Sequence, residues 1–208
     1  MKGYTRTEDG LYCYDTVHYP HLIGELGGLC QLKNTNTLLA AIEELLKTGY
    51  PITEDSIRNG FSHVCELTGL MGRWQKLDSN PTVICDTGHN IGGIQYIVEQ
   101  LSMQKYEKLH IVIGMVNDKD ISGVLQMLPK DAVYYFTQAS VKRALPAEQI
   151  KSLAEKYGLY GDRYPDVKTA FETAHRQAGK KDFIFVGGSS FIVADLLSTV
   201  YHPGHLSM

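Results

Sequence analysis

Several features that would assign a chain to a special class are absent from this sequence. It has four cysteines in 208 residues, none of them in a C-x-x-C pair, which argues against a disulfide framework and favours a reducing compartment. No apolar run approaches the ~20 residues that a membrane span requires, and the first ten residues, MKGYTRTEDG, lack the apolar centre of a signal peptide. These absences predict a cytoplasmic protein.

Excess charge of one sign is also lacking, and so are the usual phosphate-binding motifs. The net charge of −3 predicts neither nucleic acid nor an anionic membrane as a partner. No G-x-x-x-x-G-K-[ST] occurs, and no G-x-G-x-x-G follows an expected strand, so neither a P-loop nor a dinucleotide fingerprint is predicted. Hydrophobic residues make up 43% and charged residues 21% of the chain, which is the composition of an ordinary globular protein.

What is present divides into two parts, and the first, residues 1–70, is predicted to be the end of a larger domain. Residues 1–28 show no strong period, with short strands or irregular structure around LYCYD. Apolar residues at helical spacing predict a helix over 33–47, and Thr53 is expected to cap a second helix that runs to about Leu67. Two amphipathic helices with little sheet to pack on indicate an incomplete domain.

The second part, residues 71–208, alternates short apolar segments with amphipathic ones. This alternation predicts a mostly parallel sheet with helices on both faces. The strands are expected at 82–86, 109–114, 132–137 and 182–187, and the helices at 91–104, 121–128, 147–157, 166–178 and 190–200. The predicted fold class is α/β, with a Rossmann-like doubly wound domain of roughly 140 residues.

The turn DTGHN after the first of these strands is the leading candidate for a binding site. Ligands of open parallel sheets lie beyond the carboxyl ends of the strands, and this turn supplies Asp86, His89 and Asn90. A carboxylate would repel a phosphate beside it but can accept hydrogen bonds from the paired hydroxyls of a ribose. The alternative is that Asp86 and Asn90 only cap the helix and His89 is solvated.

Other polar positions have a functional and a structural interpretation each. Ser189 in GGSSF either contacts a ligand or caps the next helix, and Phe191 replaces the last glycine of a G-x-S-x-G elbow, which argues against a serine hydrolase. Arg73 in G-R-W either grips a phosphate or lies on the surface. The loop MVNDKD (115–120) is either ligand-facing or simply solvated.

No metal site is predicted within the chain. His202 and His205 form a pair near the end of the sequence but have no third ligand close by. Cys85 lies inside an apolar strand, where a buried structural thiol is expected.

Together, G-R-W, DTGHN and GGSSF, in this order and spacing, resemble the C-terminal part of the bifunctional folylpolyglutamate synthase/dihydrofolate synthase family, in the Mur ligase superfamily. The stretch GGLCQLKNTNTLLAAIEELL is similar to the family's G-x-x-Q-x-x-N segment, at the end of its central ATPase domain. The resemblance covers nearly all of the chain except about the first 25 residues.

This resemblance implies an ATP- and Mg²⁺-dependent ligase that joins L-glutamate to dihydropteroate or folate through an acyl phosphate. It implies that Arg73 reaches the ATP phosphates and that Asp86 holds the ribose. His89 and Ser189 would act at the reaction centre, and His89, Asn90 and Ser189 would contact the substrates. A tyrosine found in some members is replaced by Phe191, which removes a hydroxyl contact.

The resemblance also implies that essential parts lie upstream. The family's P-loop, Mg²⁺ ligands and folate-binding loop precede the matched region, so the upstream ATPase domain is an expected partner and the chain alone is expected not to ligate. Two alternatives stay open: a Mur-type cell-wall amino-acid ligase, whose D-N-P-R motif is missing here, and a non-catalytic nucleotide-binding module.

Overall fold

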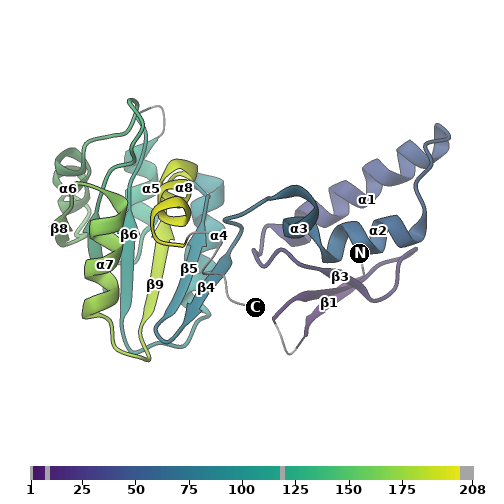
Figure 1. Cartoon of the computed structure of the whole chain (residues 1–208), viewed down its shortest axis with the longest axis horizontal. Coiled ribbons are helices and arrows are strands. Elements are labelled where there is room, and N and C mark those ends of the chain that lie inside the picture. Colours follow the sequence, from purple (N-terminus) through teal and green to yellow (C-terminus); the bar gives the residue numbers. More distant parts are fainter. Residues whose placement is uncertain (1, 8–9, 118–119, 202–208) are drawn as a thin grey trace. The chain divides into compact units, whose positions relative to one another are not determined.

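The computed structural model describes residues 2–7, 10–117 and 120–201. The chain forms two compact units, Met1–Arg73 and Trp74–Met208 (Figure 1). None of the helices in the described ranges is both long and apolar enough to cross a bilayer.

The first unit contains more sheet than its sequence predicts. Strands β1 (Gly3–Arg6), β2 (Tyr12–Asp15) and β3 (Leu22–Gly24) form an antiparallel sheet in that order. The expectation of little sheet was wrong because these strands have only three or four residues, too few to show a period. The inward side chains of β2 and β3 are nevertheless buried, and they form a small core with residues of the helices: Tyr12, Tyr14, Leu22, Leu39, Ile57 and Phe61.

Three helices follow the small sheet: α1 (Gln31–Lys47), α2 (Glu54–Ser62) and α3 (Val64–Thr68). Thr53 caps α2 as predicted, because its hydroxyl accepts the Ser56 N–H and the Ser56 hydroxyl accepts the Thr53 N–H. The single helix expected as far as Leu67 is interrupted at His63, whose backbone leaves the helical region with φ −133° and ψ 40°.

The second unit is the predicted doubly wound α/β domain. Its six strands lie in the order β4-β5-β9-β6-β7-β8, and only β4 runs antiparallel to its neighbour. The strands are β4 (Gln75–Ser79), β5 (Thr82–Asp86), β6 (Leu109–Ile113), β7 (Val133–Phe136), β8 (Gly161–Arg163) and β9 (Phe183–Gly187). The four buried strands match the predicted ones, whereas the edge strands β4 and β8 are mostly polar and exposed and were not predicted.

Helices cover both faces of this sheet, because alternate strand residues join two different cores. One core includes α4 (Ile91–Ser102), α5 (Ile121–Met127) and α6 (Ala147–Glu155). The other includes α7 (Val167–Gln177) and α8 (Ser190–Thr199). Trp74 packs on the first core, with its ring centroid 6.3 Å from that of Phe185.

The chain order creates a topological switch point at β9. From β5 the chain passes through α4, α5 and α6 to the far edge, and then returns through α7 to insert β9 between β5 and β6 (Figure 1). The helices that follow β5 and β9 therefore diverge to opposite faces. This is the arrangement in which open α/β sheets bind ligands.

Candidate functional site

The turns DTGHN and GGSSF begin side by side at this switch point. Asp86 and Ile113 are both register partners of Gly187, so the carboxyl ends of β5, β9 and β6 meet. A Cβ on Gly187 would lie 2.7 Å from the Asp86 carbonyl oxygen, and a Cβ on Gly188 would lie 2.7 Å from the Gly114 carbonyl oxygen. The glycines therefore allow three backbones to converge where a ligand would bind.

Asp86 is only 9% exposed, and both of its carboxylate oxygens accept backbone hydrogen bonds. Oδ2 accepts the Trp74 N–H at 2.7 Å, and Oδ1 accepts the Gly88 N–H at 2.7 Å. The first bond holds Trp74 in the left-handed region, with φ 50°. Asp86 therefore joins the G-R-W segment to the DTGHN turn.

His89 has a defined tautomer. Its Nδ1 lies 2.9 Å from the Thr87 carbonyl oxygen, and since a carbonyl only accepts, Nδ1 carries the proton. In the neutral imidazole Nε2 is then the acceptor atom. The ring is half-buried, so a ligand can reach it.

Two predicted site residues cap helices, as the structural alternative supposed. Asn90 Oδ1 accepts the Gly93 N–H at 2.8 Å and caps α4, while its side chain remains exposed. Ser189 Oγ accepts the Phe191 N–H at 3.2 Å and caps α8. Ser189 is only 2% exposed, so its described role is to position the helix, and its predicted contact with the reaction centre stays a prediction.

The remaining predicted positions fall in different places. Arg73 is half-buried and is the last residue of the first unit, directly before the clamped Trp74. Phe191 lies under the Arg143 guanidinium, whose carbon is 4.8 Å from the ring centroid. In the loop MVNDKD, Asp120 caps α5 through the Gly123 N–H at 2.9 Å, while residues 118–119 lie outside the described residues, as do His202 and His205.

No group of three or more His, Cys, Asp or Glu side chains that could hold a metal lies in the described ranges. Cys85, directly before Asp86, is no candidate nucleophile either. Burial, with a smaller effect of the neighbouring Asp86 charge, raises the pKa of its thiol to about 12, so the thiol stays protonated at neutral pH.

Sequence reasoning missed two participants in this site. The Trp74 N–H is a backbone group, so no side-chain motif could predict its hydrogen bond to Asp86. Thr87 was not singled out, yet its Oγ1 is buried and has no hydrogen-bond partner in the part of the chain that the structure describes. The only sequence feature that could have pointed to Thr87 was its position, as a hydroxyl residue between Asp86 and His89.

Comparisons with known proteins agree with this geometry. The family described as "Mur ligase, glutamate ligase domain" matches residues 72–190. The dihydrofolate synthase/folylpolyglutamate synthase of Escherichia coli K12 is 32% identical over 170 residues, covering 80% of this chain and 37% of the relative. The corresponding Mycobacterium tuberculosis protein is 29% identical over 150 residues, covering 70% of this chain and 29% of the relative.

Solved structures of the same enzymes are also similar to this chain. E. coli FolC in complex with ADP, without folate substrate, has a TM-score of 0.74 at 26% identity, covering 95% of this chain and 46% of that chain. A bifunctional folylpolyglutamate synthase/dihydrofolate synthase with Mn, AMPPNP and L-glutamate bound has a TM-score of 0.62 at 28% identity, covering 73% and 36%. The chain thus spans less than half the length of these relatives, and the resemblance seen in its motifs is confirmed: it belongs to the Mur ligase family that carries the glutamate ligase domain.

Proposed function

We propose that this chain is the C-terminal part of an ATP-dependent ligase that adds L-glutamate to dihydropteroate, to folates, or to both. The observation that carries the proposal is the Asp86 clamp at the switch point of a sheet whose sequence matches a glutamate ligase domain. Relatives with the same domain have been solved with DHPP and ADP, and with AMPPNP and L-glutamate, which supports the substrate classes.

The reaction requires activation because a carboxylate is a poor electrophile. One carboxylate oxygen of the pteroate or folate attacks the γ-phosphorus of ATP, and ADP leaves. The amino group of glutamate then attacks the carbonyl carbon of the acyl phosphate. The C–O bond to phosphate breaks, a proton leaves the nitrogen, and an amide and inorganic phosphate result. Catalysis of such steps depends mainly on positioning and on stabilising charge.

On this proposal Asp86 and Arg73 act on the nucleotide. The two backbone bonds to Asp86 fix the plane of its carboxylate, so a ribose hydroxyl that donates to it meets an acceptor that is already oriented. The Arg73 guanidinium, which directly precedes the clamped Trp74, binds the phosphates and offsets their charge.

His89 is proposed to act at the reaction centre. With Nδ1–H held by the Thr87 carbonyl, neutral Nε2 accepts a hydrogen bond from the attacking amine or takes its proton. Asn90 is proposed to contact the substrates at the mouth of the turn in addition to capping α4. Ser189 supports the same region from its buried capping position.

The metal ion is proposed to bind elsewhere. A relative was solved with Mn, and Mg²⁺ would neutralise charge on the transferred phosphoryl group. The described residues of this chain offer no cluster of ligands for it, so the metal ligands and the P-loop are proposed to come from the upstream ATPase part. The chain alone is therefore expected not to ligate.

The test compares Asp86→Ala and His89→Ala with the wild type in the ligase that contains both the upstream part and this chain. We expect Asp86→Ala to weaken ATP binding roughly tenfold, because one or two charge-assisted hydrogen bonds are lost. We expect His89→Ala to leave ATP binding intact and to lower glutamate-dependent turnover about 100-fold, the usual contribution of a general base. If neither variant changes ATP binding or turnover, the turn is only a helix cap and the proposed site is wrong.

A further inference from the structure

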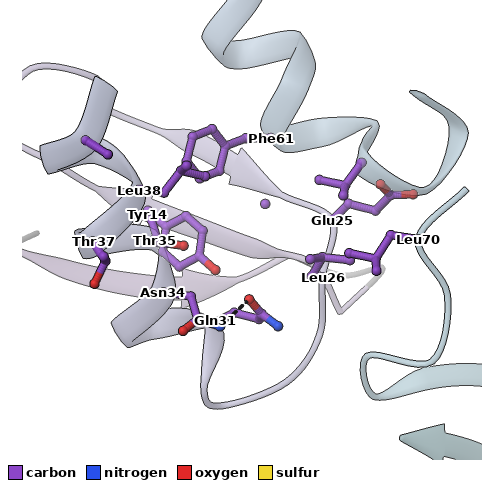
Figure 2. A pocket seen from close by; sticks show the side chains of 13 residues that line it. Tyr14, Glu25, Leu26, Gln31, Asn34, Thr35, Thr37, Leu38, Phe61 and Leu70 are labelled. Atoms are coloured by element: carbon purple, nitrogen blue, oxygen red, sulfur yellow. Dashed lines mark hydrogen bonds between the residues drawn. The ribbon is translucent and has the colours of Figure 1, made fainter. Parts of the chain in front are cut away.

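The proposed amino-acid substrate, L-glutamate, needs a positive partner for a carboxylate, and the cavity beside α1 in the first unit does not supply one. This cavity has a volume of about 510 Å³, and Figure 2 shows the side chains that line it. The only charged residue in its lining is Glu25, whose carboxylate accepts the Cys65 N–H at 2.8 Å. An anionic ligand would be repelled by this charge.

In the second unit, cationic side chains are scarce at the edge of the sheet where the candidate site lies. The last residues of β5, β9, β6 and β7 are register partners there. In the described parts of the loops that follow these four strands, the only lysine or arginine residues are Lys142 and Arg143. Both belong to residues 137–146, called the β7–α6 loop below.

The β7–α6 loop is held by its neighbours on two sides. On α8, the Asp195 carboxylate accepts the Ser140 N–H at 2.7 Å and the Ser140 hydroxyl at 2.8 Å. In the loop after β6, the Asn117 N–H donates to the Arg143 carbonyl oxygen at 3.2 Å. The backbone that carries Arg143 is therefore fixed by the fold, which is the support that a binding residue requires.

The side chain of Arg143 is oriented as well. Its guanidinium carbon lies 4.8 Å from the centroid of the Phe191 ring, in the first turn of α8. This contact orients a planar group that carries five N–H donors and binds carboxylates in a bidentate manner. Phe191, for which the sequence predicts only a lost hydroxyl contact, thus has a role that needs a ring and no hydroxyl.

We propose that Arg143 binds a carboxylate of the incoming L-glutamate, with Asp195 as a positioning residue that acts through the β7–α6 loop. This inference rests on the proposed function and names the group that recognises its amino-acid substrate. His89 follows β5, and Phe191 follows the neighbouring strand β9. A small molecule whose amine lies at His89 can therefore present a carboxylate to the guanidinium that lies over Phe191.

The test compares variants of the β7–α6 loop in the ligase that contains both the upstream part and this chain. Arg143→Gln should raise the KM for L-glutamate roughly 10- to 100-fold, because a charge-assisted pair is lost, while kcat and the KM for ATP stay within about twofold. Arg143→Lys keeps the charge but not the planar fork, so its KM for glutamate should rise by a smaller factor. Lys142→Gln, the matched control, removes the adjacent exposed cation and should retain the wild-type KM.

The role of Asp195 is tested with two substitutions. Asp195→Ala removes both bonds to Ser140, and should raise the KM for glutamate without a further rise when combined with Arg143→Gln. Asp195→Asn should behave as the wild type, because an amide can replace both bonds. A merely structural role would lower the stability of Asp195→Ala but would leave its KM for glutamate unchanged.

Three results would overturn the assignment of Arg143. They are an unchanged KM for glutamate in Arg143→Gln, an equal rise in Lys142→Gln, and an equal rise in the KM for ATP, which would mean that the guanidinium binds a phosphate. Circular dichroism checks that each variant is folded, and Arg143→Lys provides a second, milder change at the same position.

The wild type separates this inference from the proposed function. If it does not ligate glutamate with ATP, the proposed function is wrong and the inference falls with it. If it ligates glutamate and Arg143→Gln keeps the wild-type KM, the proposed function stands and the assignment of Arg143 is wrong.

Discussion

At the residue scale, Gly188 shows why the switch point depends on missing side chains. Its φ is +88°, and a Cβ there would lie 2.7 Å from the Gly114 carbonyl oxygen. We expect Gly188→Ala to lower the free energy of unfolding by about 3 kcal/mol, from left-handed strain together with overpacking. Gly158→Ala is the control, with φ +76° but only Lys130 Cδ near, at 3.9 Å, and should lose about 1 kcal/mol. Equal losses in urea denaturation would show that crowding does not matter.

Residue types alone could predict where polar groups gather but not which atoms they contact. Asp86, His89 and Asn90 follow a buried strand, so their place at the carboxyl edge was predictable. That Asp86 binds two backbone N–H groups was not, since one of them belongs to Trp74, twelve residues earlier. Such bonds depend on how the backbone turns, which side-chain patterns do not encode.

At the element scale, substitutions of Asn90, the cap of α4, can distinguish a structural role from a contact with a ligand. Asn90→Ala should destabilise the second unit by about 1 kcal/mol, whereas Asn90→Asp should retain stability because aspartate caps equally well. If Asn90 also contacts substrate, Asn90→Asp will lower turnover without lowering stability. Asp166→Ala, which removes the similar cap of α7, should lose comparable stability and leave turnover unchanged. Full turnover by Asn90→Asp would mean that Asn90 caps α4 and does not contact the substrate.

Each helix of the second unit lies within two residues of its expected ends. This agreement has a physical reason. Their apolar faces repeat over two or more turns, which specifies both type and extent. The missed strands β4 and β8 pair at the sheet edges and are largely exposed, so no apolar run marks them. In the first unit, short strands were one of two possibilities around LYCYD, where β2 lies, and strands of three or four residues are too short to show a period.

At the scale of the whole molecule, alternating strands and helices predict a parallel sheet but not its strand order. The insertion of β9 between β5 and β6 is what creates the switch point, and it is decided by long-range packing of two cores. The same holds on α1: the sequence marks Leu38 and Leu39 alike as apolar, and only the fold distinguishes the exposed one from the buried one.

The opposite end of the sheet from the candidate site contains a buried polar network that should make stability depend on pH. His110 Nε2 lies 3.2 Å from Asp182 Oδ2, and its Nδ1 lies 2.9 Å from the Tyr135 hydroxyl. Burial lowers the pKa of His110, although the Asp182 carboxylate partly opposes this. Burial would raise the pKa of Asp182, but bonds from the Gly179 N–H and from His110 hold it below its ordinary value.

The pKa values of His110 and Asp182 are both lowered by folding, so both groups make the folded state less stable as the pH falls. The unfolded chain binds more protons than the folded one below the ordinary histidine pKa of 6.5, so stability should fall as pH drops below that value, and again in the range where Asp182 titrates. For one proton the slope is at most about 1.4 kcal/mol per pH unit. Urea denaturation at pH 7.5, 6.5 and 5.5 measures it. His110→Gln should flatten the profile over this range, whereas His175→Gln, which removes an exposed histidine of the same unit, should retain the wild-type slope. An unchanged slope in His110→Gln would mean that the network does not link protonation to folding.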